Sequence, residues 1–197
     1  MVTTTPFRIG VLGTHSTGKT TLVQRIEMEL RGQGVTVGRT GGFGRRAAEI
    51  GLPKMQRHTE TSTEWIIATA IANEIEIGIS AEVVLADRAV HDALAYYMAA
   101  LEYRGEPVNS DAVERLRILV ATQTPKYDLC IATRLDPEMP VATEHFYDPR
   151  YRALVDEHVH RLLAEDHVDH LVVGSSADEQ RLVVQTAVEA ALKAVGA

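Results

Sequence analysis

The chain has 197 residues, of which 45% are hydrophobic and 24% are charged, and its formal net charge at pH 7 is −7. This length and composition fit a single domain, residues 1–197, with a hydrophobic core of ordinary size. The excess of acidic residues argues against a nucleic-acid partner, because binding a phosphate backbone requires clustered lysine and arginine.

Membrane and secretory segments are not expected. No apolar run approaches the length of about 18 residues that a membrane-spanning helix needs, so we expect no membrane partner. Residues 1–6 lack the basic start and the apolar stretch of a signal peptide. The single cysteine, Cys130, lies in an apolar run and is expected to be buried. One thiol cannot form an internal disulfide, which fits a cytoplasmic location.

The first motif is Gly-Thr-His-Ser-Thr-Gly-Lys-Thr at residues 13–20, which matches the phosphate-binding pattern G-x-x-x-x-G-K-[ST]. We call these residues the phosphate loop. A short β-prone run, residues 7–12, precedes it, and a segment with helical spacing, residues 19–31, follows it. A strand, a glycine loop and a helix therefore come in the order that phosphate binding requires.

The residue types of the loop explain its chemistry. Gly13 and Gly18 allow backbone conformations that a side chain would block, so that bared N–H groups form a nest for the β-phosphate. Lys19 can reach the β- and γ-phosphates, and Thr20 can place its hydroxyl on Mg²⁺. His15 can touch the γ-phosphate or the acceptor, or can face solvent, and both interpretations stay open. The residues expected to bind the nucleotide are Gly13, His15, Ser16, Thr17, Gly18, Lys19, Thr20 and Thr21.

The rest of the chain alternates between strand and helix patterns. Strands are expected at 7–12, 35–37, 82–87, 127–133 and 170–173, and helices at 19–31, 45–50, 61–78, 89–103, 110–124, 148–164 and 176–195. Capping boxes are expected at Thr61 with Glu64 and at Ser176 with Glu179, and Asp148 before Pro149 is a typical helix start. Such alternation predicts an α/β fold of three layers, with a five-stranded parallel sheet covered by helices on both faces.

An acidic residue ends the strand expected at 82–87. A phosphate-loop enzyme needs a carboxylate near the loop, and Asp87 is the best candidate to hold the Mg²⁺ shell or to activate the nucleophile. Arg88 beside it can clamp a phosphoryl group or a substrate hydroxyl. The alternative is that Asp87 caps a helix and that Arg88 pairs with Asp92, which lies four residues further on the same helix face.

Three other features call for an interpretation. Trp65, the only tryptophan, can stack on a base or lie in the core, and both options stay open. A glycine-rich loop at 39–46 follows a strand end, where open α/β sheets bind ligands. Histidines 158, 160, 167 and 170 are close in sequence, but the first two point to different helix faces, so we expect no metal site there.

The sequence Asp-Arg-x-x-x-Asp-Ala-x-Ala-Tyr at 87–96, after a Val-Val-Leu strand, resembles the nucleoside and nucleotide kinases of the P-loop NTPase class. Tyr-Asp-Leu at 127–129 and Thr-Leu after the phosphate loop are also similar. The resemblance is greatest to the AAA-type ATPase and kinase group that includes the nicotinamide-riboside kinase domain of bifunctional NAD-synthesis regulators, and it covers nearly the whole chain.

This resemblance implies ATP- and Mg²⁺-dependent phosphorylation of a hydroxyl on a small molecule, with a nucleoside or nucleoside-like metabolite as the expected acceptor. Lys19 and Thr20 would serve the triphosphate and the metal, Asp87 would be the general base or the metal-shell acid, and Arg88 would contact substrate or phosphate. The catalytic set is thus Lys19, Asp87 and Arg88, and the metal set is Thr20 and Asp87. By the same resemblance, residues 174–177 would contact the base of ATP.

Two segments depart from the family pattern. Gly41, Gly42 and Phe43 stand where the family has a glutamate before an arginine, although Arg45 and Arg46 remain. The acceptor pocket is therefore expected to differ, and the acceptor-binding set is Asp87, Arg88, Arg45, Arg46 and Trp65. The family's lid corresponds to about residues 134–152. Its arginine is missing at 144–147, so that Arg134, Arg150 and Arg152 are the candidates to replace it.

Two further functions compete with a kinase. The chain can be a regulatory ATPase or GTPase switch, although it lacks the Asn-Lys-x-Asp guanine motif. It can also be a binding protein that uses the fold as a scaffold, against which the intact Lys19, Thr20 and Asp87 argue. The expected partner of a kinase is a small-molecule phosphoryl acceptor, and a homodimer is left open.

Overall fold

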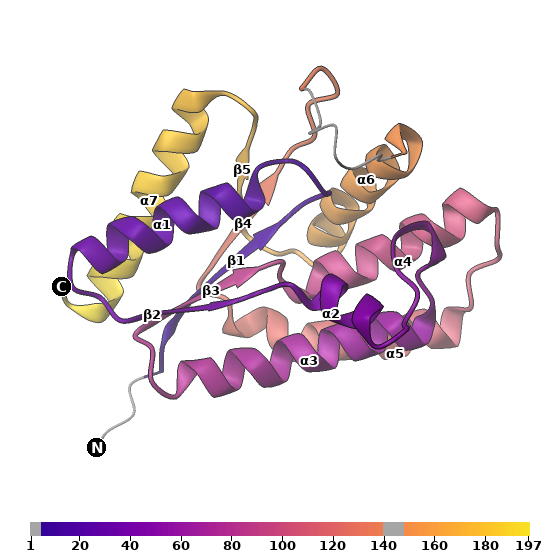
Figure 1. Cartoon of the computed structure of the whole chain (residues 1–197), viewed down its shortest axis with the longest axis horizontal. Coiled ribbons are helices and arrows are strands. Elements are labelled where there is room, and N and C mark those ends of the chain that lie inside the picture. The colour runs from indigo at the N-terminus through magenta and orange to yellow at the C-terminus, as the bar shows by residue number, and fades with distance from the viewer. Residues whose placement is uncertain (1–4, 140–147) are drawn as a thin grey trace.

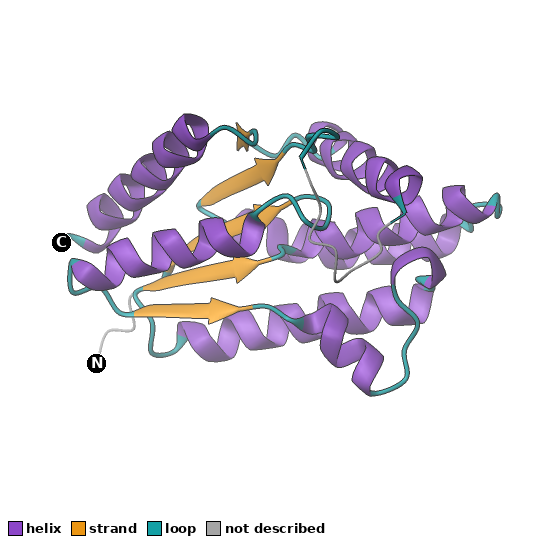
Figure 2. Cartoon of the chain, turned by 45° about the horizontal axis from the view of Figure 1, so that its top comes forward, coloured by secondary structure: helices purple, strands orange, loops and turns teal. Residues whose placement is uncertain are grey.

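Five parallel strands form the central layer of the protein, which we describe from a computed structural model in residues 5–139 and 148–197. The strands are β1 (Phe7–Leu12), β2 (Val37–Thr40), β3 (Val83–Asp87), β4 (Leu129–Thr133) and β5 (His170–Val173), in the spatial order β2-β3-β1-β4-β5. All four pairings are parallel, so that every strand ends at the same edge of the sheet (Figure 2).

Helices cover both faces of this sheet (Figure 1). They are α1 (Lys19–Gly32), α2 (Phe43–Glu49), α3 (Glu60–Gly78), α4 (Val90–Arg104), α5 (Ser110–Gln123), α6 (Pro149–Glu165) and α7 (Ala177–Val195), with short 3-10 turns η1 (Met55–Arg57) and η2 (Thr124–Lys126). α1 and α7 lie on one face, and α3, α4, α5 and α6 lie on the other. The predicted three-layer fold is confirmed.

Two hydrophobic cores fill the spaces between the layers, and the alternation of side chains along the strands divides residues between them. In β4, Ile131 packs toward α1 and α7, while its neighbours Cys130 and Ala132 pack toward the other helices. Successive strand residues point to opposite faces, so a strand covered on both sides is apolar at every position. Cys130 is buried as predicted.

The strand order brings the ends of three strands together. β1 lies between β3 and β4, and its last residues pair with theirs, Val11 with Asp87 and Leu12 with Ala132. The phosphate loop follows β1 directly. The connection after β1 leads toward the β2 edge of the sheet, whereas the connection after its neighbour β4 leads toward the β5 edge. Open α/β sheets bind their ligands at such a point.

Several element boundaries differ from those expected. β2 begins at Val37 instead of residue 35. The N–H of Val35 donates a hydrogen bond to the carbonyl of Leu30 at the end of α1, so it is not available to a neighbouring strand. Arg39 and Thr40 are therefore strand residues and do not belong to a loop. α2 begins at Phe43, two residues before the expected start.

The predicted capping boxes are only partly correct. α3 is capped by Thr59, whose hydroxyl accepts from the N–H of Ser62 while the Ser62 hydroxyl accepts from the N–H of Thr59. The expected box of Thr61 with Glu64 is wrong, because serine at the third helical position already fills the role of glutamate. At α7, Ser176 caps as expected, and Glu179 accepts a hydrogen bond from its hydroxyl at 2.7 Å. Asp148 caps α6 as predicted.

Within the described part of the chain, no helix has both the length and the apolar character that crossing a membrane requires.

A buried polar group ties α3 to the rest of the helical layer. Glu74 is fully buried, and its carboxylate accepts from the amide of Gln123 at 2.6 Å and from the hydroxyl of Tyr127 at 3.0 Å. The Tyr127 hydroxyl in turn accepts from the first N–H of α4, that of Val90, at 3.3 Å. Burial raises the pKa of Glu74, against the effect of both hydrogen bonds. This group therefore helps to fix the start of α4.

Replacement of Glu74 by alanine is expected to lower the free energy of unfolding by about 2 to 4 kcal/mol, because two buried polar side chains lose their partner and a cavity remains. Urea denaturation measures the change. Glu76→Ala on the exposed face of the same helix is the matched control, with an expected change below about 0.5 kcal/mol. Equal effects of the two substitutions would contradict a structural role for this group.

Candidate active site

The phosphate loop has the backbone shape that its glycines predict. Gly13 has a φ of 139°, and a Cβ atom there would come within 2.0 Å of the Thr133 hydroxyl oxygen, so that both conformation and space require glycine. Gly18, with a φ of 83°, immediately precedes α1 and has no side chain to cap it. The first N–H groups of α1 and the positive end of its dipole therefore favour an anion in place of a capping side chain.

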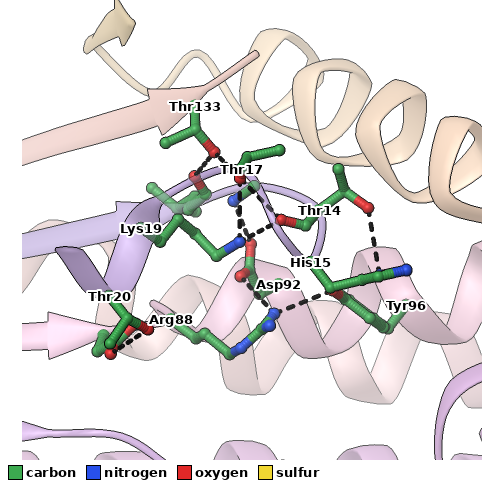
Figure 3. Close-up of polar contacts among 12 residues, drawn as sticks. Thr14, His15, Thr17, Lys19, Thr20, Arg88, Asp92, Tyr96 and Thr133 are labelled. Carbon is green, nitrogen blue, oxygen red and sulfur yellow. Dashed lines mark hydrogen bonds and ion pairs between the residues drawn. The ribbon is translucent and has the colours of Figure 1, made fainter. Parts of the chain in front are cut away.

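The side chain of Lys19 is folded back over the loop. The residue is 4% exposed, and its ammonium donates to the carbonyl oxygen of Thr14 and to the hydroxyl of Thr17, the latter at 3.3 Å (Figure 3). Burial, followed by the positive charge of Arg88, lowers the pKa of this lysine. A phosphate oxygen in the loop would offer the ammonium a charged acceptor, which makes a stronger hydrogen bond than a carbonyl does.

Thr20 and Asp87 meet as their predicted roles require. The Thr20 hydroxyl donates to Oδ2 of Asp87 at 3.0 Å, although the two residues are 67 positions apart in sequence. Mg²⁺ takes hard oxygen ligands, and in nucleotide sites it takes one or two protein groups beside phosphate oxygens and water. A hydroxyl and a carboxylate next to a phosphate loop fit that ion.

Arg39 is a member of the site that the sequence did not reveal. Its guanidinium donates to Oδ2 of Asp87 at 2.7 Å, the same oxygen that accepts from Thr20. β2 lies directly beside β3, which places a long side chain from position 39 within reach of the strand-end acid. The available signal is a lone arginine near a strand that neighbours one ending in an acid. The sequence pattern starts that strand at residue 35, two residues too early, and so leaves Arg39 outside it.

Arg88 is paired as the alternative interpretation expected. Its guanidinium lies 3.4 Å from the Asp92 carboxylate, donates to the Tyr96 hydroxyl at 3.0 Å, and lies 5.2 Å from the centre of the Tyr96 ring. The backbone of Arg88 has a φ of 87°, a strained conformation for a residue with a side chain. Its side chain remains 37% exposed, so a bound substrate can still reach it.

Asp92 does more than pair with Arg88. Its carboxylate is almost completely buried and accepts the N–H of Gly13, the first residue of the phosphate loop, at 2.9 Å. Burial raises the pKa of Asp92, while the charges of Lys19 and Arg88 and the Gly13 hydrogen bond act in the opposite direction. α4 thus holds the start of the loop. The sequence does not indicate this role, because Asp92 and Gly13 are 79 positions apart.

His15 points into the protein, so the solvent-facing interpretation is wrong. Its Nδ1 atom lies 3.2 Å from the Tyr96 hydroxyl, and its ring is next to those of Tyr96 and Tyr151, with centres 6.0 and 6.3 Å away. Burial, with smaller effects from Arg88, Lys19 and Arg152, lowers the pKa of His15 to about 3. The imidazole is therefore neutral near pH 7. Of the residues expected to bind the nucleotide, Ser16, Gly18, Thr20 and Thr21 are exposed instead.

Arg152 supports the phosphate loop from α6. It is 6% exposed and donates to the carbonyl oxygens of His15 at 3.1 Å and Ser16 at 2.9 Å. The Thr14 hydroxyl donates back to the carbonyl of Arg152 at 2.9 Å. Two consecutive carbonyls of the loop are thus held by one guanidinium. In a trans peptide the N–H of the next residue points away from the carbonyl, so the N–H groups of Ser16 and Thr17 are directed away from Arg152.

The other lid candidates lie elsewhere. Arg134 is exposed just after β4, and Arg150 lies over the ring of Tyr103, 5.2 Å from its centre. Of the lid segment expected at about 134–152, residues 140–147 lie outside the described residues, and so do the departures noted at 144–147.

The candidate acceptor residues lie around α2. Gly41 packs closely against Asp87, because a Cβ atom on Gly41 would lie only 3.1 Å from the Asp87 Cβ. α2 starts two residues later, at Phe43. The side chain of Arg45 is 83% exposed, and Arg46 lies 5.8 Å from the centre of the Trp65 ring. Trp65 is half-buried and belongs to neither core cluster.

No group of three potential metal ligands occurs among residues 5–139 and 148–197.

Replacement of Arg152 by methionine is expected to weaken ATP binding at least about tenfold, because two loop carbonyls lose charged donors that each contribute about 1.5 to 3 kcal/mol. Titration calorimetry with ATP measures the affinity. Arg161→Met, on an exposed part of the same helix, is the matched control and is expected to bind ATP as the unmodified chain does. If both variants bind equally well, Arg152 does not support the loop.

Comparisons with known proteins identify a family and similar folds. A family model described as an AAA domain matches residues 8–181. No curated protein matches the chain. The NadR protein in complex with NAD and AMP-PNP superimposes with a TM-score of 0.68 at 18% identity, covering 98% of this chain and 50% of that one. The NadR protein in complex with NR gives 0.67 at 16% identity, covering 98% and 52%. The chain thus spans about half the length of these NadR chains.

A third solved structure matches over its whole length. Deoxyadenosine kinase from M. mycoides with bound dCTP superimposes with a TM-score of 0.62 at 11% identity, covering 93% of this chain and 100% of that one. At such identities the likeness shows a shared fold, and it confirms the resemblance to P-loop nucleoside kinases that the sequence indicated. Because the family model spans most of its length, the chain belongs to the AAA domain family, with the fold of P-loop nucleoside kinases.

Proposed function

We propose that the protein is an ATP- and Mg²⁺-dependent phosphotransferase that phosphorylates a hydroxyl of a nucleoside or nucleoside-like small molecule. The observation that carries this proposal is the 3.0 Å hydrogen bond from the Thr20 hydroxyl to Asp87, beside the buried ammonium of Lys19. A phosphate loop by itself only binds phosphate. A strand-end carboxylate that meets the loop's threonine adds a group for the metal shell or for the acceptor hydroxyl.

Phosphoryl transfer asks the protein mainly for positioning and for charge neutralisation. The loop N–H groups and Lys19 would hold the phosphates, while Thr20 and Asp87 would hold the metal. When bound, Mg²⁺ neutralises charge on the phosphate oxygens. Asp87 would complete the metal shell or accept the proton of the acceptor hydroxyl.

The acceptor would lie between the end of β3 and α2. The Arg88 guanidinium, held by Asp92 and Tyr96, would contact the acceptor or the transferred phosphoryl group. Arg46 and Trp65 form an adjacent pair with a flat, partly exposed indole, which suits the stacking of a planar base. Ligands in the matching solved structures support this class, since they include NR in NadR and dCTP in deoxyadenosine kinase.

Lys19→Met and Asp87→Asn are each expected to lower phosphoryl transfer by at least about 10²- to 10³-fold, because each removes charge that the transition state requires. A panel of nucleosides and nucleoside monophosphates is incubated with ATP and Mg²⁺, and the phosphorylated product is identified by mass. The controls are Lys193→Met and Asp111→Asn, two exposed positions on α7 and α5, with unchanged rates expected.

A near-normal rate for either site variant on the true acceptor would refute these assignments. ATP hydrolysis at one rate, whatever acceptor is present, would favour the regulatory ATPase instead.

A further inference from the structure

Arg39 lies between two carboxylates. Its Nη2 atom is 2.7 Å from Oδ2 of Asp87, and its Nη1 atom is 3.8 Å from Oε2 of Glu27 on α1. The three side chains are 11% to 25% exposed, so the charges are only partly screened by water. One guanidinium thus has a close partner at the metal site and a second, more distant partner beside it.

Glu27 is itself held in place. Its other oxygen accepts from Arg31 at 3.0 Å, and Arg31 donates to the carbonyl of Val37 at the start of β2 at 2.7 Å. Glu27 is therefore a fixed acceptor between α1 and β2, available to Arg39 without rearrangement of the backbone. A shift of about 1 Å would bring Nη1 of Arg39 to normal hydrogen-bond distance from Glu27.

A metal ion held by Thr20 and Oδ2 of Asp87 would compete with Arg39 for that oxygen. Oδ2 of Asp87 already accepts from both Thr20 and Arg39, and an oxygen of a carboxylate has about two lone-pair positions. An arginine is charged at every accessible pH, and its charge repels a divalent cation at short range. Thr20 can turn its hydroxyl oxygen toward a metal, whereas Arg39 has no lone pair to offer and would have to leave Oδ2 for a metal to bind there.

We propose that Arg39 is a positioning residue that occupies Asp87 when the metal is absent and moves to Glu27 when metal-bound nucleotide enters. The inference rests on the proposed function in one respect, namely that Asp87 serves the metal. Arg39 then sets how strongly a metal ion promotes nucleotide binding, and Glu27 sets how easily Arg39 withdraws. Neither effect requires an acceptor molecule.

The test measures the factor by which Mn²⁺ tightens the binding of AMP-PNP to the full chain. Calorimetric affinities in saturating Mn²⁺ and in EDTA give this coupling factor directly. Arg39→Gln is expected to raise the factor at least about threefold, because the competing charge is gone. Glu27→Gln is expected to lower it at least about threefold, because Arg39 loses its second partner. Arg39→Lys, which keeps the charge, is expected to stay within about twofold of the unmodified chain.

A double substitution separates this mechanism from a general change of charge. With Arg39→Gln in place, the further change Glu27→Gln is expected to leave the factor within about twofold, since Glu27 acts through Arg39. Arg115→Gln, an exposed site on α5, is the control for the loss of one positive charge and is expected to have no effect. A merely structural role for Arg39 would move both single variants in the same direction.

The inference is overturned if Arg39→Gln leaves the coupling factor unchanged or lowers it. If that variant fails to fold, the Glu27→Gln variant decides, and an unchanged or increased factor overturns the inference. If the Lys19→Met substitution weakens AMP-PNP binding but Mn²⁺ does not increase the affinity of the unmodified chain, the inference fails while nucleotide binding stands. If the coupling shifts as expected but no acceptor is phosphorylated, the proposed kinase function fails and the role of Arg39 stands.

Discussion

The parallel pairing of β1 with β3 on one side and β4 on the other is the constraint on which the site depends. It sets Val11 beside Asp87 and Leu12 beside Ala132, so that three strands end together. From those ends come the phosphate loop, its acid and the hydroxyl of Thr133, which lies 2.6 Å from that of Thr17. A shift of register by one residue would turn the Asp87 side chain to the opposite face of the sheet.

The loop is also fixed from the helical layer behind it. Asp92 on α4 holds the N–H of Gly13, and Arg152 on α6 holds the carbonyls of His15 and Ser16, so the first half of the loop is supported before any ligand binds. When the loop backbone is held in this way, its N–H groups need little rearrangement to accept a negative charge. The same helices carry Tyr96 and Tyr151 around His15, which links the loop to the hydrophobic core.

The sequence was sufficient to predict the parallel sheet, the shape of the glycine loop and the position of Asp87 at the end of β3, because these follow from local patterns: alternation of element types, glycine spacing and an acid at a strand end. It failed where contacts between distant segments decide. The start of β2 depends on the hydrogen bond from Val35 to Leu30, and with it the place of Arg39. The supporting roles of Asp92 and Arg152 involve partners 79 and 137 positions away, which no local spacing reveals.

Histidine is usually the side chain whose charge changes near neutral pH. In this loop, burial keeps the imidazole of His15 uncharged, with a pKa of about 3, although it lies between Gly13 and Gly18. Mild acidification, of the kind met in cellular compartments, therefore adds no positive charge to the loop through this ring. Any attraction between this segment and an anion would therefore not depend on the titration of His15 in that pH range.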